Sequence, residues 1–377
     1  MRQPAAGAAA LGAVVVGTTY GVITHARALR LAGLDVIGLV GRDPAKTSAR
    51  AKQMGIPNPL TDLAAALALP GVSVVVVATP PHTHAEITLA AIAAGKHVMC
   101  EKPFALNLAE ARNMLSAAER AGVVHLLGTE YRFSATQVAV RRVVSSGVIG
   151  QPRLANLVRY LPSLVNPDTA LPGWWESADS GGGWLGAAGS HLIDQVRSTL
   201  GEFAALSASL DRLSARPSMT ADDTYSIHFR LASGCSGVLQ GSCAVTGPVT
   251  SLTKISGTVG SVWVEPAGRG RAESVWIDTG SGPRQVDDPP DQPSVQPDPP
   301  PRYLLPAYAV ETGWHTKGGD LAPFTRLYQR LRARVAGQDV PDDPPAATFR
   351  DGVAVQAVLD AARQSAGGAG WVEVGAA

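Results

Sequence analysis

One lysine lies where it could transfer a proton. Residues 97–101 are typical of a short buried strand, and Lys102 and Pro103 follow that strand directly. A buried or paired lysine can have its pKa tuned toward neutrality and can then exchange protons with a substrate. We therefore expect Lys102 to act in catalysis beside Glu101, with an ordinary salt bridge between the two side chains as the alternative.

A glycine turn near the start of the chain could hold a phosphate. It joins a buried strand to a helix, and its residues are Gly17, Thr18, Thr19, Tyr20 and Gly21. Such a turn brings backbone N–H groups and a helix N-terminus to a pyrophosphate without any side chain. Thr19 stands where the dinucleotide-binding pattern has its middle glycine, so a tight turn without a ligand stays open as the alternative.

The end of the second predicted strand bears on the choice of cofactor. An acidic residue there hydrogen-bonds the adenine ribose of NAD, whereas an arginine can pair with the 2′-phosphate of NADP. This sequence has Arg42 at that point, with Gly41 before it, and the pattern therefore favours NADP over NAD. The alternative is that Asp43 and Pro44 begin a helix while Arg42 is solvated.

Further polar residues follow two more predicted strands. Thr79, Pro80, Pro81 and His84 come after the strand at 72–78, as Glu101 and Lys102 come after the next one. Open α/β sheets bind ligands at the carboxyl ends of their parallel strands. We expect all of these residues to contact the dinucleotide.

The elements that position these residues alternate between strands and helices. Strands are predicted at 11–16, 35–40, 72–78, 97–101 and 123–128, and helices at 23–31, 44–54, 62–69, 84–94 and 107–121. The strands are continuous apolar runs, as expected where helices cover both faces of a parallel sheet. The pattern predicts a doubly wound, Rossmann-type α/β domain over residues 1–130.

The hydrophobic pattern changes after residue 150. Strands are predicted at 154–161, 206–213, 224–231, 235–243, 252–256 and 261–265, and helices at 190–200, 324–336 and 350–366. The period moves toward two, which is typical of an antiparallel sheet with one covered face. We expect residues 131–377 to form an α+β domain on a largely antiparallel, open sheet, with the proline-rich stretch 289–301 running over the surface.

Composition excludes several classes of protein. The chain has 377 residues, of which 45% are hydrophobic, and a formal net charge of +1, which excludes extensive disorder and gives no general attraction to nucleic acid or membranes. The three cysteines are scattered, no set of residues has metal-ligand spacing, and no apolar run reaches 18 residues. The alanine-rich start reads better as a strand than as a signal peptide. A cytoplasmic protein without a metal is expected.

These motifs together resemble those of a known family. They are residues 17–21 with His25, residues 79–81 with His84, residues 101–103, residues 131–133, residues 147–152 and residues 181–194. The sequence resembles the Gfo/Idh/MocA oxidoreductases, which include glucose–fructose oxidoreductase and inositol dehydrogenase. The resemblance implies hydride transfer between a nicotinamide and a hydroxyl-bearing carbon of a sugar, cyclitol or similar polyol. It also implies a homodimer or homotetramer assembled through the C-terminal sheet.

The resemblance carries specific roles onto two residues. Lys102 matches the lysine that contacts nicotinamide ribose and substrate oxygen, and His191 matches a downstream histidine. A neutral histidine is suited to take up the proton that a hydroxyl loses as hydride leaves. Many members also carry an aspartate four residues before that histidine, where this chain has Ala187. Either the proton passes through Lys102 and His191 alone, or the chemistry differs.

The substrate-side candidates are less specific. They are Tyr131, Arg132, Trp175, His191 and Asp194, with Trp174 and His315 as weaker ones. Arg132 could instead form an ion pair between domains, and the tryptophans could pack in a core. Asp194, one helical turn after His191, could orient the helix or the imidazole.

The expected function is an NAD(P)(H)-dependent oxidoreductase acting on a sugar, cyclitol or related hydroxyl or ketone. Two other functions remain open: Ala187 and Thr19, in place of the middle glycine, motivate the first, and Ala187 motivates the second. One is a dinucleotide-binding sensor or scaffold without turnover. The other is redox-assisted elimination or hydrolysis with a recycled cofactor.

Overall fold

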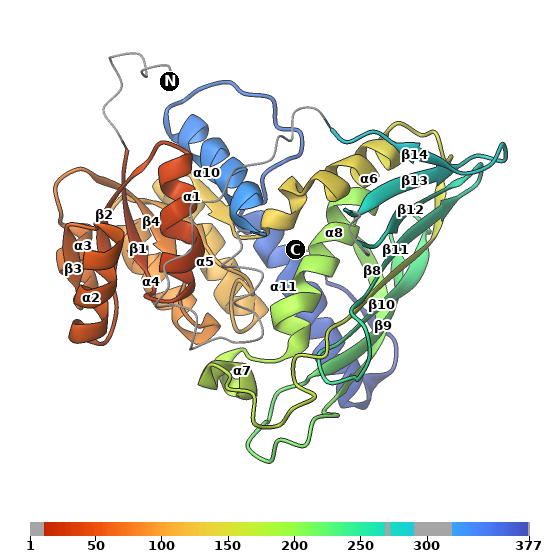
Figure 1. The fold of residues 1–377 in the computed structure, drawn as a ribbon, viewed down its shortest axis with the longest axis horizontal. Coiled ribbons are helices and arrows are strands. Elements are labelled where there is room, and N and C mark those ends of the chain that lie inside the picture. Colours follow the sequence, from red (N-terminus) through yellow and green to blue (C-terminus); the bar gives the residue numbers. More distant parts are fainter. Residues whose placement is uncertain (1–10, 268–271, 290–318, 376–377) are drawn as a thin grey trace.

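The computed structural model describes residues 11–267, 272–289 and 319–375. His315 and almost all of the proline-rich stretch lie outside these ranges. Two sheets organise the chain (Figure 1), and each has helices packed against it.

The first sheet is parallel and has six strands in the order β3-β2-β1-β4-β5-β6. The strands are β1 Gly12–Val16, β2 Asp35–Val40, β3 Asn58–Leu60, β4 Val72–Val77, β5 His97–Cys100 and β6 His125–Leu127. The helices between them are α1 Ala26–Leu31, α2 Pro44–Met54, α3 Leu63–Leu67, α4 His84–Ala93 and α5 Leu108–Ala121. This strand order is that of the doubly wound dinucleotide-binding fold, so the predicted fold class of the first domain is confirmed.

Local sequence signals explain several helix ends in this domain. The Asn107 side chain accepts a hydrogen bond from the Glu110 backbone N–H at the start of α5. Gly122 ends the same helix with φ +64°, a conformation that suits a residue without a side chain. At α2, Asp43 caps the helix in the same way through the Lys46 N–H.

Helices from distant parts of the chain cover the two faces of the parallel sheet. On one face, α10 (Leu321–Val335) packs beside α1, although about 300 residues separate them in the sequence (Figure 1). On the other face, Phe349 and Val353 of α11 (Phe349–Gln364) join the core beneath α4 and α5. The late part of the chain thus completes the core of the first domain.

The second sheet has nine strands in the order β14-β13-β12-β11-β7-β10-β9-β8-β15. They are β7 Pro152–Tyr160, β8 Phe203–Asp211, β9 Thr224–Leu231, β10 Ser236–Ser242, β11 Thr250–Gly257, β12 Ser261–Glu265, β13 Ser274–Asp278, β14 Arg284–Val286 and β15 Val372–Glu373. Only the β7–β10 pair is parallel among the pairs that the structure describes. The predicted, largely antiparallel sheet is confirmed, and β13, β14 and β15 add strands that the sequence pattern did not indicate.

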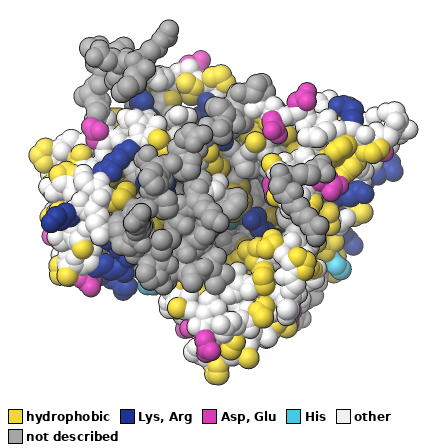
Figure 2. Space-filling view, in the orientation of Figure 1, with side chains coloured by type: hydrophobic (Ala, Val, Ile, Leu, Met, Phe, Trp, Pro, Cys, Tyr) yellow, Lys and Arg dark blue, Asp and Glu magenta, His cyan; other side chains and the backbone are white. Residues whose placement is uncertain are grey.

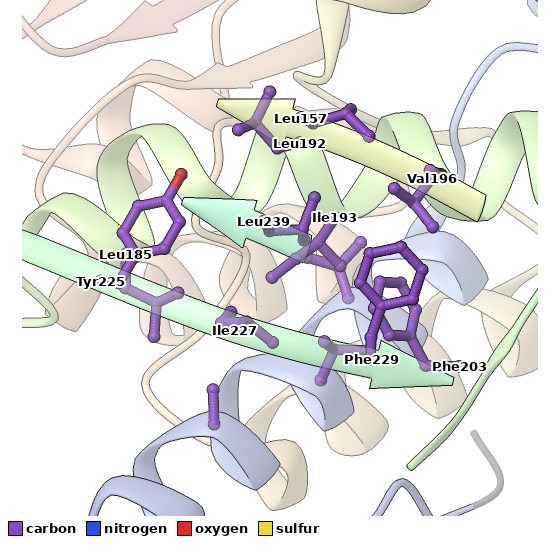
Figure 3. Close-up of a cluster of buried hydrophobic side chains, with 14 of the residues drawn as sticks. Leu157, Leu185, Leu192, Ile193, Val196, Phe203, Tyr225, Ile227, Phe229 and Leu239 are labelled. Atoms are coloured by element: carbon purple, nitrogen blue, oxygen red, sulfur yellow. The ribbon is translucent and has the colours of Figure 1, made fainter. Parts of the chain in front are cut away.

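Helices pack on one face of this sheet and anchor the catalytic candidates. They are α6 Ala135–Ser145, α8 Ser190–Leu200 and α11, and a short helix, α7 Gly173–Glu176, precedes α8. In Figure 3, Leu192, Ile193 and Val196 of α8 face the buried side chains of β7, β9 and β10. Burial of this apolar stripe fixes where α8 begins, and His191 is its second residue.

Candidate active site

The glycine turn after β1 requires both of its glycines. Gly17 has φ +125°, and a Cβ there would lie 2.1 Å from the carbonyl oxygen of Ala78. A Cβ on Gly21 would lie 2.7 Å from Val15. The Gly17 N–H donates to Val40 O at 2.9 Å, so the turn lies where β1, β2 and β4 end together. This is the point at which such sheets bind dinucleotides.

The three residues inside the turn have different surroundings. Arg50 of α2 donates hydrogen bonds to the Thr18 carbonyl oxygen and to Thr19 Oγ1. Tyr20 points elsewhere, since its hydroxyl donates to Asp320 Oδ2 at 2.7 Å just before α10. Thr18 and Thr19 are half-buried within the glycine turn. The Tyr20 hydroxyl, through its hydrogen bond to Asp320, links the start of α10 to the first domain.

Basic residues gather where β2 ends. Arg42 is exposed at that point, and Asp43 starts α2 behind it. Burial and the neighbouring charge of Arg50, with a smaller effect from Arg42, lower the pKa of Lys46, while Asp43 opposes them. Arg42, just before α2, and Lys46 and Arg50, within it, therefore place three cations near one another. The Asp43 cap and the exposed Arg42 match the alternative interpretation, and the preference for NADP stays a prediction.

His84 joins two of the strand-end loops. Its Nε2 lies 2.8 Å from the Thr79 carbonyl oxygen, and its Nδ1 lies 3.0 Å from that of Pro103. Burial is the largest influence on the pKa of His84 and lowers it. The structure thus places Thr79, Pro80 and Pro81 at the end of β4 with His84 behind them, buried against backbone. His84 supports the loops that a ligand would touch.

Glu101 and Lys102 diverge at the end of β5. The Glu101 carboxylate is buried, and its Oε1 lies 3.2 Å from His25 Nε2, whose ring also contacts the Tyr328 hydroxyl at 2.6 Å. The Lys102 ammonium leaves the first domain and donates to the Ala187 carbonyl oxygen at 2.9 Å. The lysine side chain therefore does not form the salt bridge with Glu101 that was the alternative. It reaches the second domain instead.

His191 lies close to the residue that Lys102 contacts. Ala187 belongs to a helical turn, Leu185–Gly189, that runs directly into α8, and His191 follows four residues later. The imidazole is 7% exposed and stacks on Tyr131, with ring centroids 4.2 Å apart and planes 26° apart. The structure thus brings Lys102, Tyr131 and His191 together from both domains.

A buried glutamate faces this histidine. Glu130 opens the helical turn Glu130–Phe133 after β6, and its Oε2 lies 3.9 Å from His191 Nε2. Burial, followed by the charge of Glu101, raises the pKa of Glu130 well above its usual value, while Lys102 acts in the opposite direction. Glu130 can therefore retain a proton at a pH where an exposed glutamate would be ionised.

Arg132 and Asp194 bind each other. The Arg132 guanidinium donates to both Asp194 oxygens, at 2.7 and 2.6 Å, and to Asp351 of α11 at 2.8 Å. Arg132 and Asp194 are buried, and the pair joins the turn after β6 to α8. The observed arrangement is the ion pair considered as the alternative, although by the predicted bounds all three residues belong to the second domain. Arg132 and Asp194 therefore position α8, and their contact with substrate stays a prediction.

The tryptophan candidates differ in burial. Trp175 packs in the core of the second domain beside Trp184, with ring centroids 5.8 Å apart. This is the core packing that was the alternative to a substrate contact. Trp174 is half-buried next to it. His315 lies outside the described residues.

Three residues at this site escaped the sequence analysis: Arg50, Glu130 and Asp320. Arg50 lies one turn after Lys46 on the same face of α2, and its position on the first helix after Arg42 was a usable signal. Glu130 adjoins the 131–133 motif, yet no spacing rule points to it. Asp320 reaches the site from a segment 300 residues away from Tyr20, and no local pattern reveals such a contact.

Two further properties concern the described residues as a whole. None of their helices is long and apolar enough to cross a membrane. Within the same ranges, no group of three histidine, cysteine, aspartate or glutamate side chains could hold a metal ion. The face shown in Figure 2 carries lysine, arginine and acidic side chains scattered among one another.

A parallel sheet in this strand order, a glycine turn at its switch point and a lysine that reaches into a second domain define a two-domain protein of the Rossmann class. Two family models match the chain. One, described as an oxidoreductase family with an NAD-binding Rossmann fold, matches residues 11–129, and the GFO/IDH/MocA C-terminal domain matches residues 138–263. The chain belongs to the Gfo/Idh/MocA oxidoreductase family, as the sequence motifs predicted.

Named relatives are similar over part of their length. Levoglucosan dehydrogenase of Pseudarthrobacter phenanthrenivorans is 30% identical over 61% of this chain and 58% of its own. The 1,5-anhydro-D-fructose reductase of Ensifer adhaerens is 37% identical over 46% of this chain and 52% of its own. The chain thus spans little more than half of these curated relatives. A levoglucosan dehydrogenase structure in complex with NADH superposes with a TM-score of 0.81 at 25% identity, covering 98% of this chain and all of that one.

Proposed function

We propose that this protein is a nicotinamide dinucleotide-dependent oxidoreductase acting on a sugar or related polyol. One observation carries the proposal: the Lys102 side chain, which begins at the end of β5, contacts the helical turn that leads into His191. Lys102 thus connects the sheet edge that carries the glycine turn to the turn before His191. A dinucleotide held at the carboxyl ends of β1 and β4 would extend toward the end of β5, where Lys102 begins.

The residues fit a bound dinucleotide. A Cβ at Gly17 would meet Ala78 and one at Gly21 would meet Val15, so the turn has to be built from glycines, as in turns that present backbone N–H groups to a pyrophosphate. Thr18, Thr19, Thr79, Pro80 and Pro81 line the same strand ends, with His84 and Glu101 supporting them from below. When bound, the nicotinamide would supply or accept hydride.

Lys102 and His191 divide the proton chemistry. An ammonium at Lys102 can donate a hydrogen bond to a substrate oxygen and stabilise the charge that develops there. His191, held by Tyr131, is placed to take up the hydroxyl proton during oxidation and to return it during reduction. The buried surroundings keep water from competing for that proton.

The cations of α2 favour NADP as the cofactor, with NAD as the alternative. Arg42 follows β2 directly, where an adenine ribose would lie, and Lys46 and Arg50 of α2 are near enough for their charges to act on one another. A 2′-phosphate would find charge-assisted partners there. The levoglucosan dehydrogenase structure contains NADH, which supports the alternative.

The substrate class follows from the relatives. Their names include levoglucosan dehydrogenase, 1,5-anhydro-D-fructose reductase and a myo-inositol 2-dehydrogenase from Thermotoga maritima, all acting on cyclic polyols or their ketones. We propose the same class here. A panel of levoglucosan, myo-inositol and 1,5-anhydro-D-fructose is the suitable first set.

The experiment is a fluorescence titration with NADH and NADPH, followed by the sugar panel with the oxidised or reduced dinucleotide. We expect binding of at least one dinucleotide at micromolar concentration and turnover of at least one sugar. Absence of binding for both dinucleotides at millimolar concentration would overturn the proposal.

Ala187 supports a second candidate, a protein that binds the dinucleotide without net turnover or that recycles it during elimination or hydrolysis. The chain lacks a carboxylate at that position, and Lys102 contacts its backbone oxygen instead. Binding without any change of the dinucleotide across the panel would favour the sensor. Cofactor that copurifies with the protein would favour recycling.

We also propose a homodimer or homotetramer through the outer face of the second sheet. The strand register places Trp263 beside Trp276 and Leu252 beside Val158, on the face opposite the helices. Leu154 and Leu252 are exposed there, 47% and 39%. Covering such a face would remove apolar area from water. Light scattering coupled to size exclusion would distinguish a monomer from the proposed assembly.

A further inference from the structure

Glu130 is placed to interact with the proposed base. It is 2% exposed, and its Oε2 has no hydrogen-bond partner within the described part of the chain. The same oxygen lies 3.9 Å from His191 Nε2, across the boundary between the two domains. A buried carboxyl oxygen without a hydrogen bond is costly, so a protein that retains one gives it a charged or proton-sharing neighbour.

The other charged groups around Glu130 come from four elements. They are Glu101 and Lys102 after β5, Asp320 before α10, Tyr20 in the glycine turn and His191 in α8. Lys102 favours the ionised form of Glu130, while Glu101 and Asp320 disfavour it. The protonation state of Glu130 therefore depends on the charges of Lys102 and His191.

Position 187 cannot serve the same purpose. Ala187 has no acidic group, and it offers Lys102 only its backbone oxygen. The methyl group lies in a buried helical turn. Glu130, by contrast, places a carboxylate within 4 Å of the His191 imidazole.

We propose that Glu130 is the carboxylate partner of His191, and that it supplies from the first domain the acid that position 187 lacks. The inference rests on the proposed function. During oxidation the substrate O–H bond breaks and its proton goes to His191, the C–H electron pair leaves as hydride to the oxidised nicotinamide dinucleotide, and a carbonyl forms. Lys102 and the imidazolium that results both favour the ionised form of Glu130, and this carboxylate then stabilises the imidazolium. Because it acts through His191, Glu130 is a positioning residue.

A titration of His191 tests this without any substrate or dinucleotide. The full chain is labelled with ¹⁵N-histidine, the His191 signals are assigned by their loss in His191→Asn, and the pKa is followed by NMR. An opposite charge a few ångströms away favours the protonated imidazole, so we expect the pKa of His191 to be lower in Glu130→Gln than in the wild type by roughly one unit. Glu86→Gln, an exposed carboxylate on α4, should leave it unchanged. Identical titration curves for wild type and Glu130→Gln would overturn the proposal.

A second measurement uses the sugar that the wild type oxidises. Glu130→Gln should lower kcat by about 100-fold, leave the dinucleotide KM within about 2-fold, and remove one ionisation from the acidic limb of the pH profile. Glu130→Asp, which keeps a shortened carboxylate, should retain that limb and provides a second variant if the glutamine does not fold. An unchanged profile in a folded Glu130→Gln would contradict the role of Glu130. A wild type that oxidises no sugar would instead refute the proposed function, and the histidine titration would still decide the role of Glu130.

Discussion

Lys102 Nζ donates a hydrogen bond of 2.9 Å to the carbonyl oxygen of Ala187. This contact joins the end of a parallel strand in the first domain to the helical turn that precedes α8 in the second. It explains how a lysine and a histidine that are 89 positions apart can serve one site. Position 187 offers the ammonium no carboxylate, and the Glu130 carboxylate that we propose in its place lies 3.9 Å from His191 Nε2.

The glycine turn should not tolerate a side chain at Gly17. Gly17→Ala would place a Cβ 2.1 Å from the Ala78 carbonyl oxygen in a backbone conformation with φ +125°. We expect dinucleotide affinity to fall by at least about 10-fold and the free energy of unfolding by roughly 2 kcal/mol. Gly173→Ala is the matched control, because nothing lies within 4 Å of a Cβ there. Equal behaviour of the two variants in fluorescence titration would contradict this account of the turn.

The Arg132 ion pair should be essential to stability. Arg132→Met would leave the buried Asp194 without its cation and Asp351 with Arg197 alone at 3.5 Å, and should lower the free energy of unfolding by about 3 kcal/mol, measured by urea denaturation. Arg350→Met removes an exposed cation that pairs with Glu119 and should cost less than about 1 kcal/mol. Similar losses of unfolding free energy in the two variants would show that the buried ion pair contributes no more to stability than the exposed one.

Arg42 should discriminate between the two dinucleotides. Its guanidinium is exposed at the end of β2, where a 2′-phosphate would lie. Arg42→Ala should weaken NADPH binding by about 10-fold and leave NADH binding nearly unchanged. Arg30→Ala, an exposed arginine on α1, should alter neither. Calorimetric titration would refute the NADP preference if both dinucleotides lost affinity equally or neither did.

The pKa of Asp222 predicts a pH dependence of stability. Burial raises it to about 6, although a hydrogen bond from the Leu185 N–H lowers it. The folded state therefore binds a proton on Asp222 more tightly than the unfolded state, in which the pKa of an aspartate is about 4. The stabilising contribution of the proton is complete below that value and is lost as the pH rises through about 6.

Asp222→Asn should abolish that dependence while keeping an acceptor for the Leu185 N–H. Relative to the wild type, the variant should gain about 2 kcal/mol of unfolding free energy between pH 4 and pH 7. Urea denaturation at the two pH values gives the comparison. A constant difference between variant and wild type across this range would disprove the raised pKa.

Local sequence patterns sufficed for most of the fold. The buried runs of β1, β2 and β4 consist of Val, Ile and Leu and predicted a parallel sheet correctly. The three-residue β3 contains a proline and has no such pattern, so it escaped prediction. The helix α6 was missed because its valines favour strands when read locally, whereas packing against α8 and β12 makes it helical.

The site was predictable only where its residues are close in the sequence. The Gly17 turn and the Lys102 motif are short local patterns, and each indicates its chemical role by itself. The contacts of Glu130 with His191 and of Tyr20 with Asp320 depend on how distant segments meet. Arg132 illustrates the same limit, because its sequence position fits a substrate ligand and a structural cation equally well until Asp194 and Asp351 are seen around it.

Hydride transfer itself provides the most direct test of the central claim. Absorbance at 340 nm would be followed for wild type and Lys102→Ala with the sugar panel and each oxidised dinucleotide, and dinucleotide affinity would be measured on both proteins. We predict that the wild type reduces the dinucleotide with at least one sugar. Lys102→Ala should lose at least about 100-fold in kcat while its dinucleotide affinity changes by less than about 5-fold. Unchanged turnover in Lys102→Ala, or no dinucleotide reduction by the wild type with any sugar of the panel, would contradict the account.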